Sequence, residues 1–150
     1  MSDSDTVHHW NGTSYRTILN AAAAGGVMSV TCGEAGPFNG PPAHVHGGED
    51  GIFVILDGEL TCEVAGRRLT RGQPGTAFVP RGQPHSFVTG PNGVRCITVL
   101  TPGGFEGFFA DMARGQFQML QDMAAVAAIA ARYGSHFAGP GPAQREVGHA

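Results

Sequence analysis

Short stretches with the pattern of β-strands, separated by turn sequences, follow one another from residue 14 to residue 100. We predict strands over residues 14–20, 26–34, 43–46, 52–56, 59–65, 67–70, 76–79 and 94–100. The chain has 24 glycines and 10 prolines, which suit tight turns because glycine accepts positive φ angles and proline fixes its own φ. Many short strands at regular spacing are typical of an all-β sandwich or barrel.

Other stretches carry more specific expectations. The pair Asp57-Gly58 is a strong signal for a β-hairpin. Residues 52–56 are apolar throughout, so we expect both faces of that strand to be buried. Over residues 105–114 and 119–133 the spacing of apolar residues is helical. We therefore expect a flexible arm over residues 1–13, a folded domain over residues 14–137 with helices from about residue 105, and a disordered tail over residues 138–150.

Composition excludes several classes of partner. The formal net charge is −3 and no run of basic residues is present, which argues against nucleic acid and acidic membranes as partners. No apolar stretch reaches membrane-spanning length, and the first residues lack the plan of a signal peptide. Cys32, Cys62 and Cys96 form neither a CxxC pair nor a disulfide framework. We expect a cytoplasmic protein in which these cysteines are small buried hydrophobic residues.

Three histidines are the strongest chemical signal in the chain. His44 and His46 lie two residues apart in a predicted strand, so their side chains point to the same face. His85 follows the turn sequence of residues 80–84 and comes from a distant strand. Neutral imidazole is a good ligand for zinc, iron, nickel and copper. We predict that the three residues hold a metal ion, and the competing interpretation is three ordinary surface histidines.

The surroundings of these histidines resemble the two-part signature of the cupin superfamily. The first part is matched by Pro42-Ala43-His44-Val45-His46 and, after eleven further residues, Gly58; the second by Gly75, four residues, and Pro80-Arg81-Gly82-Gln83-Pro84-His85. Residues 101–109 and 131–137 also resemble the short single-cupin group called quercetin 2,3-dioxygenase-like. The resemblance implies a jelly-roll β-barrel and a divalent transition metal, one of Fe, Ni, Mn, Zn or Cu, at the bottom of an apolar pocket. It also implies a homodimer.

The chain departs from the cupin signature at the position of the carboxylate ligand. Counted back from Gly58, that position is Gly51, which has no side chain to bind a metal. Glu49 and Asp50 are the candidate replacements, as a ligand or as a catalytic base, and a solvated acidic loop is the alternative for both. The second part of the signature is also one residue shorter than in the family.

These features favour a metal-dependent enzyme, above all an oxygenase that acts on an aromatic or enolisable small molecule in specialised metabolism. Such a metal leaves positions open for substrate or dioxygen. The alternatives are an isomerase, cyclase or lyase that uses the metal as a Lewis acid, and a cupin that binds small molecules without catalysis. We expect an apolar pocket closed by residues 105–114, unless that segment only packs on the sheet, and lined by Phe53, Ile55, Phe78 and Phe87.

Overall fold

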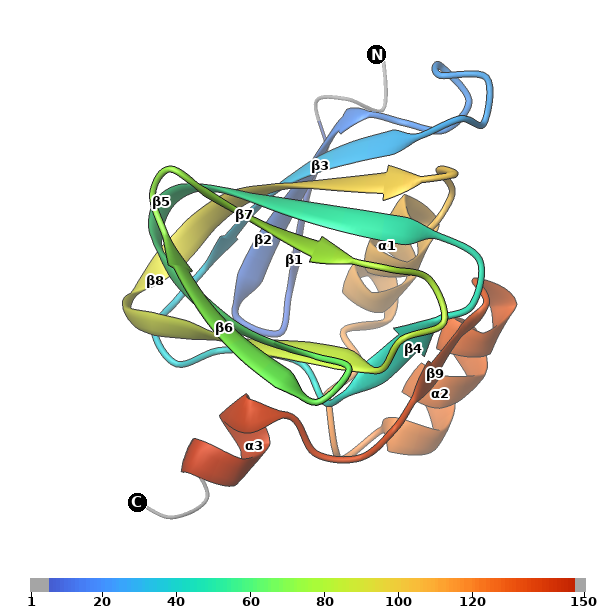
Figure 1. Ribbon diagram of the computed structural model, residues 1–150. Coiled ribbons are helices and arrows are strands. Elements are labelled where there is room, and N and C mark those ends of the chain that lie inside the picture. The colour runs from blue at the N-terminus through green and yellow to red at the C-terminus, as the bar shows by residue number, and fades with distance from the viewer. Residues whose placement is uncertain (1–5, 148–150) are drawn as a thin grey trace.

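The chain forms a curled antiparallel barrel with two helices at one end (Figure 1). A computed structural model describes residues 6–147. The elements in chain order are β1 (Val7–Trp10), β2 (Thr13–Leu19), β3 (Ser29–Ala35), β4 (His44–His46), β5 (Asp50–Val64), β6 (Arg67–Gly72), β7 (Gly75–Val79), β8 (His85–Thr101), α1 (Glu106–Gly115), α2 (Met123–Arg132), β9 (Ser135–Phe137) and α3 (Pro142–Val147). The predicted all-β barrel with short C-terminal helices is confirmed.

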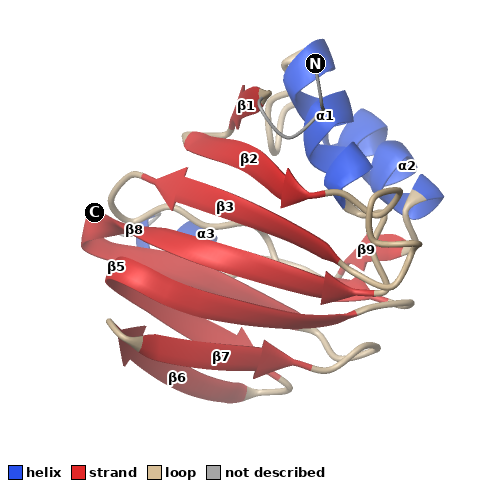
Figure 2. Ribbon diagram, turned by 90° about the horizontal axis from the view of Figure 1, so that it is seen from above, coloured by secondary structure: helices blue, strands red, loops and turns tan. Residues whose placement is uncertain are grey.

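Two long strands, β5 and β8, run through both halves of the barrel. One arm of each belongs to the half that contains β1, β2, β3 and β7 (Figure 2). The other arm belongs to the half that contains β4, β6 and β9 (Figure 1). In β5 the change from one half to the other comes at Asp57 and Gly58. The two halves therefore face each other across the interior.

The predicted hairpin at Asp57-Gly58 is wrong, because β5 continues through this pair. The register against β8 shifts on both sides of it, which marks an irregularity and not a chain reversal. Gly58 has a φ of 79°, and a side chain there would overlap the carbonyl oxygen of Gly93. Glycine is required because the two strands approach closely at the bend. The chain reverses later, at Ala65-Gly66 before β6.

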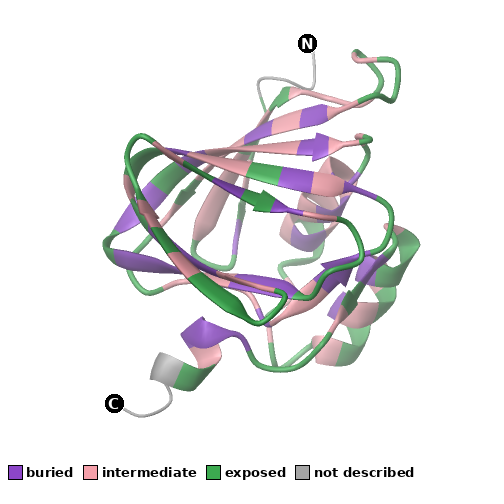
Figure 3. Cartoon of the chain, viewed as in Figure 1, coloured by how far each residue is buried: buried purple, intermediate pink, exposed green. Residues whose placement is uncertain are grey.

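Buried and exposed residues both occur along the strands of the barrel (Figure 3). Within residues 52–56, Ile55 is 1% exposed, whereas Ile52 and Leu56 are 39% and 41% exposed. The expectation that both faces of residues 52–56 are buried is therefore wrong for a single chain. In a run of apolar residues the sequence does not show which side chains point outward, although side chains of a strand alternate between its two faces. The helices also lie at the barrel end and do not cover this outer face (Figure 1).

Trp10 anchors the N-terminal segment to the helices. It ends β1, which pairs with β2, and it is 7% exposed. Its Nε1 donates a hydrogen bond of 2.6 Å to the carbonyl oxygen of Phe117, so the indole buries its ring with its N–H satisfied. This order differs from the flexible arm expected over residues 1–13, of which residues 1–5 lie outside the described part of the chain.

The segment after α2 pairs with β4, which carries two of the histidines. β9 forms three antiparallel residue pairs with β4, and the backbone N–H of Gly47 donates to the carbonyl oxygen of Gly134 at 3.0 Å. Arg145 of α3 then forms an ion pair with Glu63 of β5. The disordered tail expected over residues 138–150 is therefore ordered as far as α3, and residues 148–150 lie outside the described part.

Candidate metal centre

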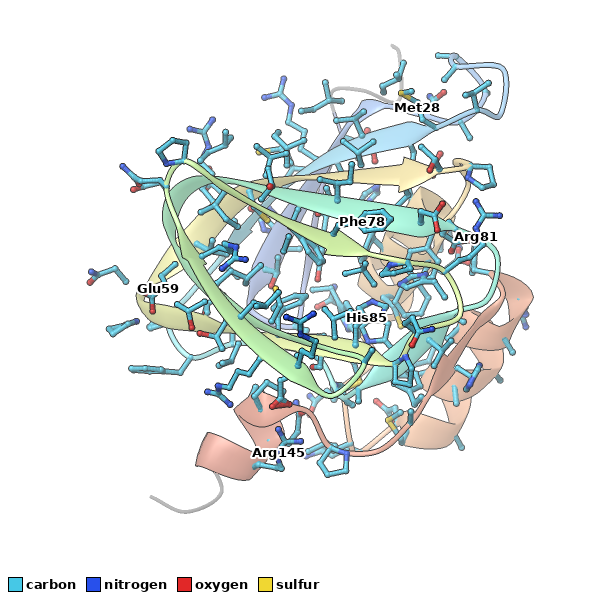
Figure 4. The ribbon with its side chains drawn as sticks, in the orientation of Figure 1. Met28, Glu59, Phe78, Arg81, His85 and Arg145 are labelled. Atoms are coloured by element: carbon cyan, nitrogen blue, oxygen red, sulfur yellow. The ribbon has the colours of Figure 1, made fainter. Side chains whose placement is uncertain are left out.

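The three histidines predicted as metal ligands lie together inside the barrel. His44 and His46 are on β4, and His85 is the first residue of β8, where it pairs directly with His44. One ring nitrogen of each lies within 4.8 Å of the others. His46 and His85 are 8% and 5% exposed, and Figure 4 shows His85 within the barrel. The alternation of β4 and its pairing with β8 create this cluster.

Each histidine has its Nδ1 atom hydrogen-bonded, which fixes the orientation of the ring. The Nδ1 of His44 lies 2.9 Å from the carbonyl oxygen of Pro42, and the Nδ1 of His85 lies 3.1 Å from that of Gln83. A carbonyl oxygen only accepts, so Nδ1 carries the proton and Nε2 is left free as a ligand atom. In His46 the Nδ1 partner is the carboxylate of Glu49.

The histidine cluster is electrostatically suited to a cation. Burial lowers the pKa of His85 to about 4. Burial, followed by the neighbouring rings of His85 and His46, holds the pKa of His44 well below its usual value. Both rings are therefore neutral at pH 7, which is the form that binds a metal.

Glu49 lies beside the histidines and is one of the residues that border the cavity. It is 9% exposed, and its Oε1 lies 2.9 Å from the Nδ1 of His46. A carboxylate in this position holds the ring and increases the basicity of the opposite nitrogen. The group of potential ligands found among the described residues contains three histidines and not Glu49.

Asp50 is separated from the histidines and paired with Arg81. Its carboxylate accepts the backbone N–H of Arg81 at 2.8 Å and two guanidinium N–H groups at 3.2 and 3.3 Å. These hydrogen bonds lower the pKa of Asp50. Figure 4 shows Arg81 at the rim of the barrel. Asp50 therefore fastens the turn of residues 80–84, which delivers His85. Spacing along the sequence could not show that Glu49 lies beside the histidines and that Asp50 pairs with Arg81 instead.

Gly51 borders the cavity, but its surroundings leave little room for a carboxylate. A Cβ atom on Gly51 would lie 3.2 Å from Cδ2 of Leu100 and 4.0 Å from Cβ of Val79. Leu100 is itself 8% exposed and belongs to the hydrophobic cluster under the helices. A side chain at this position would therefore have to displace the end of Leu100 by a few tenths of an ångström.

A largely apolar cavity of about 140 Å³ adjoins the histidines. Two of the predicted pocket residues, Phe53 and Phe87, line it and contact each other edge to face with ring centroids 5.5 Å apart. Ile55 belongs to the core cluster next to the cavity and does not line it. Phe78 differs from expectation: it is 56% exposed on the outer face, because its neighbours in β7 are the residues that point inward.

Aromatic residues at the start of α1 close the cavity beside the histidines. The ring of Phe105 meets that of His46 edge to face, with centroids 4.3 Å apart, and stacks on Phe108 at 5.0 Å. Phe109 stacks on Tyr15 at 4.1 Å. This position of residues 105–114 fits both roles considered for the segment, closure and packing. The prediction of pocket residues missed Tyr15, although the alternation of β2 could have placed it inside.

Comparisons with known proteins agree with this geometry. A profile described as a cupin domain matches residues 30–100, which include all three histidines, and no curated protein sequence matches the chain. Among solved structures, KdgF from Halomonas sp. has a TM-score of 0.62 at 14% identity, over 71% of this chain and 96% of that one. The polyketide cyclase RemF from Streptomyces resistomycificus has a TM-score of 0.54 at 25% identity, over 68% and 77%. A mutant of Bacillus subtilis oxalate decarboxylase OxdC has a TM-score of 0.59 at 19% identity, over 70% of this chain and 29% of that one.

The cupin domain that the two-part signature predicted is confirmed over residues 30–100, and the barrel shares the fold of these solved structures. The matches do not support the narrower assignment to the quercetin 2,3-dioxygenase-like group. Over residues 6–147, no helix is long and apolar enough to cross a membrane.

Proposed function

We propose that the protein is a metal-dependent cupin enzyme acting on a neutral aromatic or enolisable small molecule. The observation that carries this proposal is that three clustered imidazoles, two buried and one partly buried, each have Nδ1 bonded and one nitrogen left free. His44, His46 and His85 would hold a divalent transition metal, one of Fe, Ni, Mn, Zn or Cu. When bound, the metal supplies a Lewis acid and, if it is redox-active, a route for electrons to dioxygen.

The cavity wall favours an uncharged aromatic substrate. None of the described residues that line the cavity is Lys or Arg, so a dicarboxylate such as oxalate would meet no cationic group there other than the proposed metal. The buried Glu49 carboxylate adds a charge of the wrong sign for such an anion. The rings of Phe53, Phe87 and Phe105 instead offer flat apolar surface, on which an aromatic molecule loses little polar hydration.

Glu49 is the residue that we propose for proton transfer. It is buried, borders the cavity and contacts His46. A carboxylate there would accept a proton from a substrate hydroxyl or an enolisable carbon. Asp50, the other predicted acid, is engaged with Arg81 away from the cavity, so its part is to position the turn that bears His85.

Oxygenation is the first reaction that we propose for this site. A cyclase that uses the metal as a Lewis acid is the second, because the polyketide cyclase RemF is 25% identical over 68% of this chain. Oxygen uptake with a panel of enolisable aromatic compounds separates the two. Turnover that consumes dioxygen and stops without it supports the oxygenase, whereas an equal rate in an oxygen-free chamber supports the cyclase.

Metal binding is the part of this proposal that is tested first. Protein purified without chelators or an affinity tag should contain a transition metal by elemental analysis. His46→Ala and His85→Ala should lose it, because each removes one of three ligand atoms. His136→Ala, an exposed change on β9, is the control and should retain the metal. Full metal content in both ligand variants would contradict the proposal.

We also propose a cytoplasmic location and a homodimer. Cys32, Cys62 and Cys96 are free thiols, the state that a reducing compartment maintains. Ile52 and Phe78 expose apolar side chains on the outer face of the barrel, and a second copy of the chain would cover them.

A further inference from the structure

The cavity wall has a recess at Gly33, in the middle of β3. Gly33 borders the cavity, and a Cβ atom built on it would meet no neighbouring atom closer than the carbonyl oxygen of Ser14 at 3.9 Å. Its φ lies outside the left-handed range, so glycine is not required there by the backbone. Gly51, which also borders the cavity, is by contrast crowded by Leu100. The absence of a side chain at Gly33 therefore leaves usable space.

Polar side chains surround this recess in a cavity whose wall is largely apolar. Tyr15 and Cys96 are the register partners of Gly33 on the two neighbouring strands, and Thr31 pairs with Thr98 in the next row. All four line the cavity, and Thr31 is 6% exposed. Burial raises the pKa of Tyr15 to about 12 and that of Cys96 to about 11. Both groups are therefore protonated at neutral pH, and each has a hydroxyl neighbour, Thr13 beside Tyr15 and Thr98 beside Cys96.

Thr31 and Thr98, which border the recess, lie across the barrel from the histidines. The pairs Leu60–Thr89 and Gly58–Val94 stand on either side of the bend in β8. His85 lies four residues before Thr89, and Thr98 lies four residues after Val94. Because the two arms of β8 belong to facing halves of the barrel (Figure 1), residues at equal distances from the bend face each other. Facing sheets are separated by about 10 Å.

We propose that the Gly33 recess is a second binding pole, which accepts the far edge of an aromatic substrate and hydrogen-bonds an oxygen there. Thr31 and Thr98 are its specificity-determining residues. The inference rests on the proposed function in one respect: the opposite edge of the substrate ring is placed at the histidines. An internal apolar cavity of about 150 Å³ is enough for one benzene ring. The substrate class is thus a compact aromatic with oxygens at opposite edges.

The test compares two probes that differ only in those oxygens, 1,4-dihydroxybenzene and benzene, by calorimetric titration without oxygen. Thr31→Val and Thr98→Val remove a hydroxyl at nearly constant shape. Each should weaken binding of 1,4-dihydroxybenzene roughly two- to tenfold and leave benzene binding unchanged. Gly33→Val fills the recess and should weaken binding of both probes by about tenfold or more. Cys32→Val, on the outer side of β3, is the matched control and should change neither.

Several outcomes would overturn the recess proposal. The first is an equal loss of affinity for both probes in the threonine variants. The second is unchanged binding of both probes in Gly33→Val. The third is wild-type protein that binds neither probe at millimolar concentration. If Gly33→Val does not fold, Gly33→Ala should show a smaller loss in the same direction, and no loss would count against the recess. Repeating the titrations after chelator dialysis separates this inference from the metal site, since the threonine effects should persist without metal.

Discussion

Gly51 and Leu100 form one packing unit at the edge of the metal site. A Cβ on Gly51 would be only 3.2 Å from Cδ2 of Leu100, so we expect Gly51→Glu to destabilise the protein by about 1–3 kcal/mol through overpacking. It should not strengthen metal binding. The double variant Gly51→Glu/Leu100→Ala provides the missing space and should bind zinc more tightly than Gly51→Glu. Thermal unfolding and chelator competition measure both effects, and a stable single variant with higher metal affinity would contradict this account.

Glu49 is expected to act on the metal through His46. Glu49→Ala shortens the side chain to a methyl group and removes the hydrogen bond that orients the ring of His46. Metal affinity should fall roughly ten- to a hundredfold, the usual effect of losing such a partner. Glu49→Gln retains an acceptor for Nδ1 and should lose less. Glu34→Gln, at an exposed ion pair with Arg95, is the control, and unchanged zinc affinity in Glu49→Ala would refute the assignment.

At the scale of elements, β4 depends on β9 for most of its backbone pairing. One residue pair joins β4 to β8, and three join it to β9. A chain ending after Tyr133 should therefore lose metal affinity, because β4 then keeps only its single residue pair with β8. A chain ending after Ala138 keeps β9 and should retain the metal, although it lacks the Arg145–Glu63 ion pair of α3. Equal metal content in both truncations would show that β9 is not needed.

The elements that the sequence predicted are those whose signal is local. The strand at residues 76–79, the turn before His85 and the helix at residues 105–114 follow from alternation, Gly/Pro turns and helical spacing. β1 and β9 were missed because they are only four and three residues long, and their order comes from distant partners. The bend at Gly58 was mistaken for a hairpin because both features require a glycine with positive φ.

The same limit applies to the candidate site. The spacing of His44 and His46 fixes their common face, and the motif around His85 supplied the third residue. The roles of Glu49 and Asp50 were left open, because the loop before β5 decides which acid turns inward. Phe78 was placed in the pocket because alternation alone does not say which of two faces is the inner one.

The whole molecule exposes an apolar strip that predicts self-association. Ile52 pairs with Phe78 on one side and with Val99 on the other, so the three side chains form a row across the outer sheet. Ile52 and Phe78 are 39% and 56% exposed. We expect a dimer by light scattering at micromolar concentration, and Phe78→Lys should shift it to monomer with unchanged metal content. Monomer alone in the wild type would leave the strip without a partner and refute the homodimer.

The pairing of β4 with β9 sets the order in which the protein is completed during synthesis. His44 and His85 leave the ribosome well before residues 135–137 do. Until that last strand emerges, β4 has only its single pair with β8. Contacts between residues so far apart in sequence form late, because the intervening chain must first be ordered. We therefore expect metal loading to wait until β9 has emerged, and a chain that stops within α2 would carry all three proposed histidine ligands but no finished site.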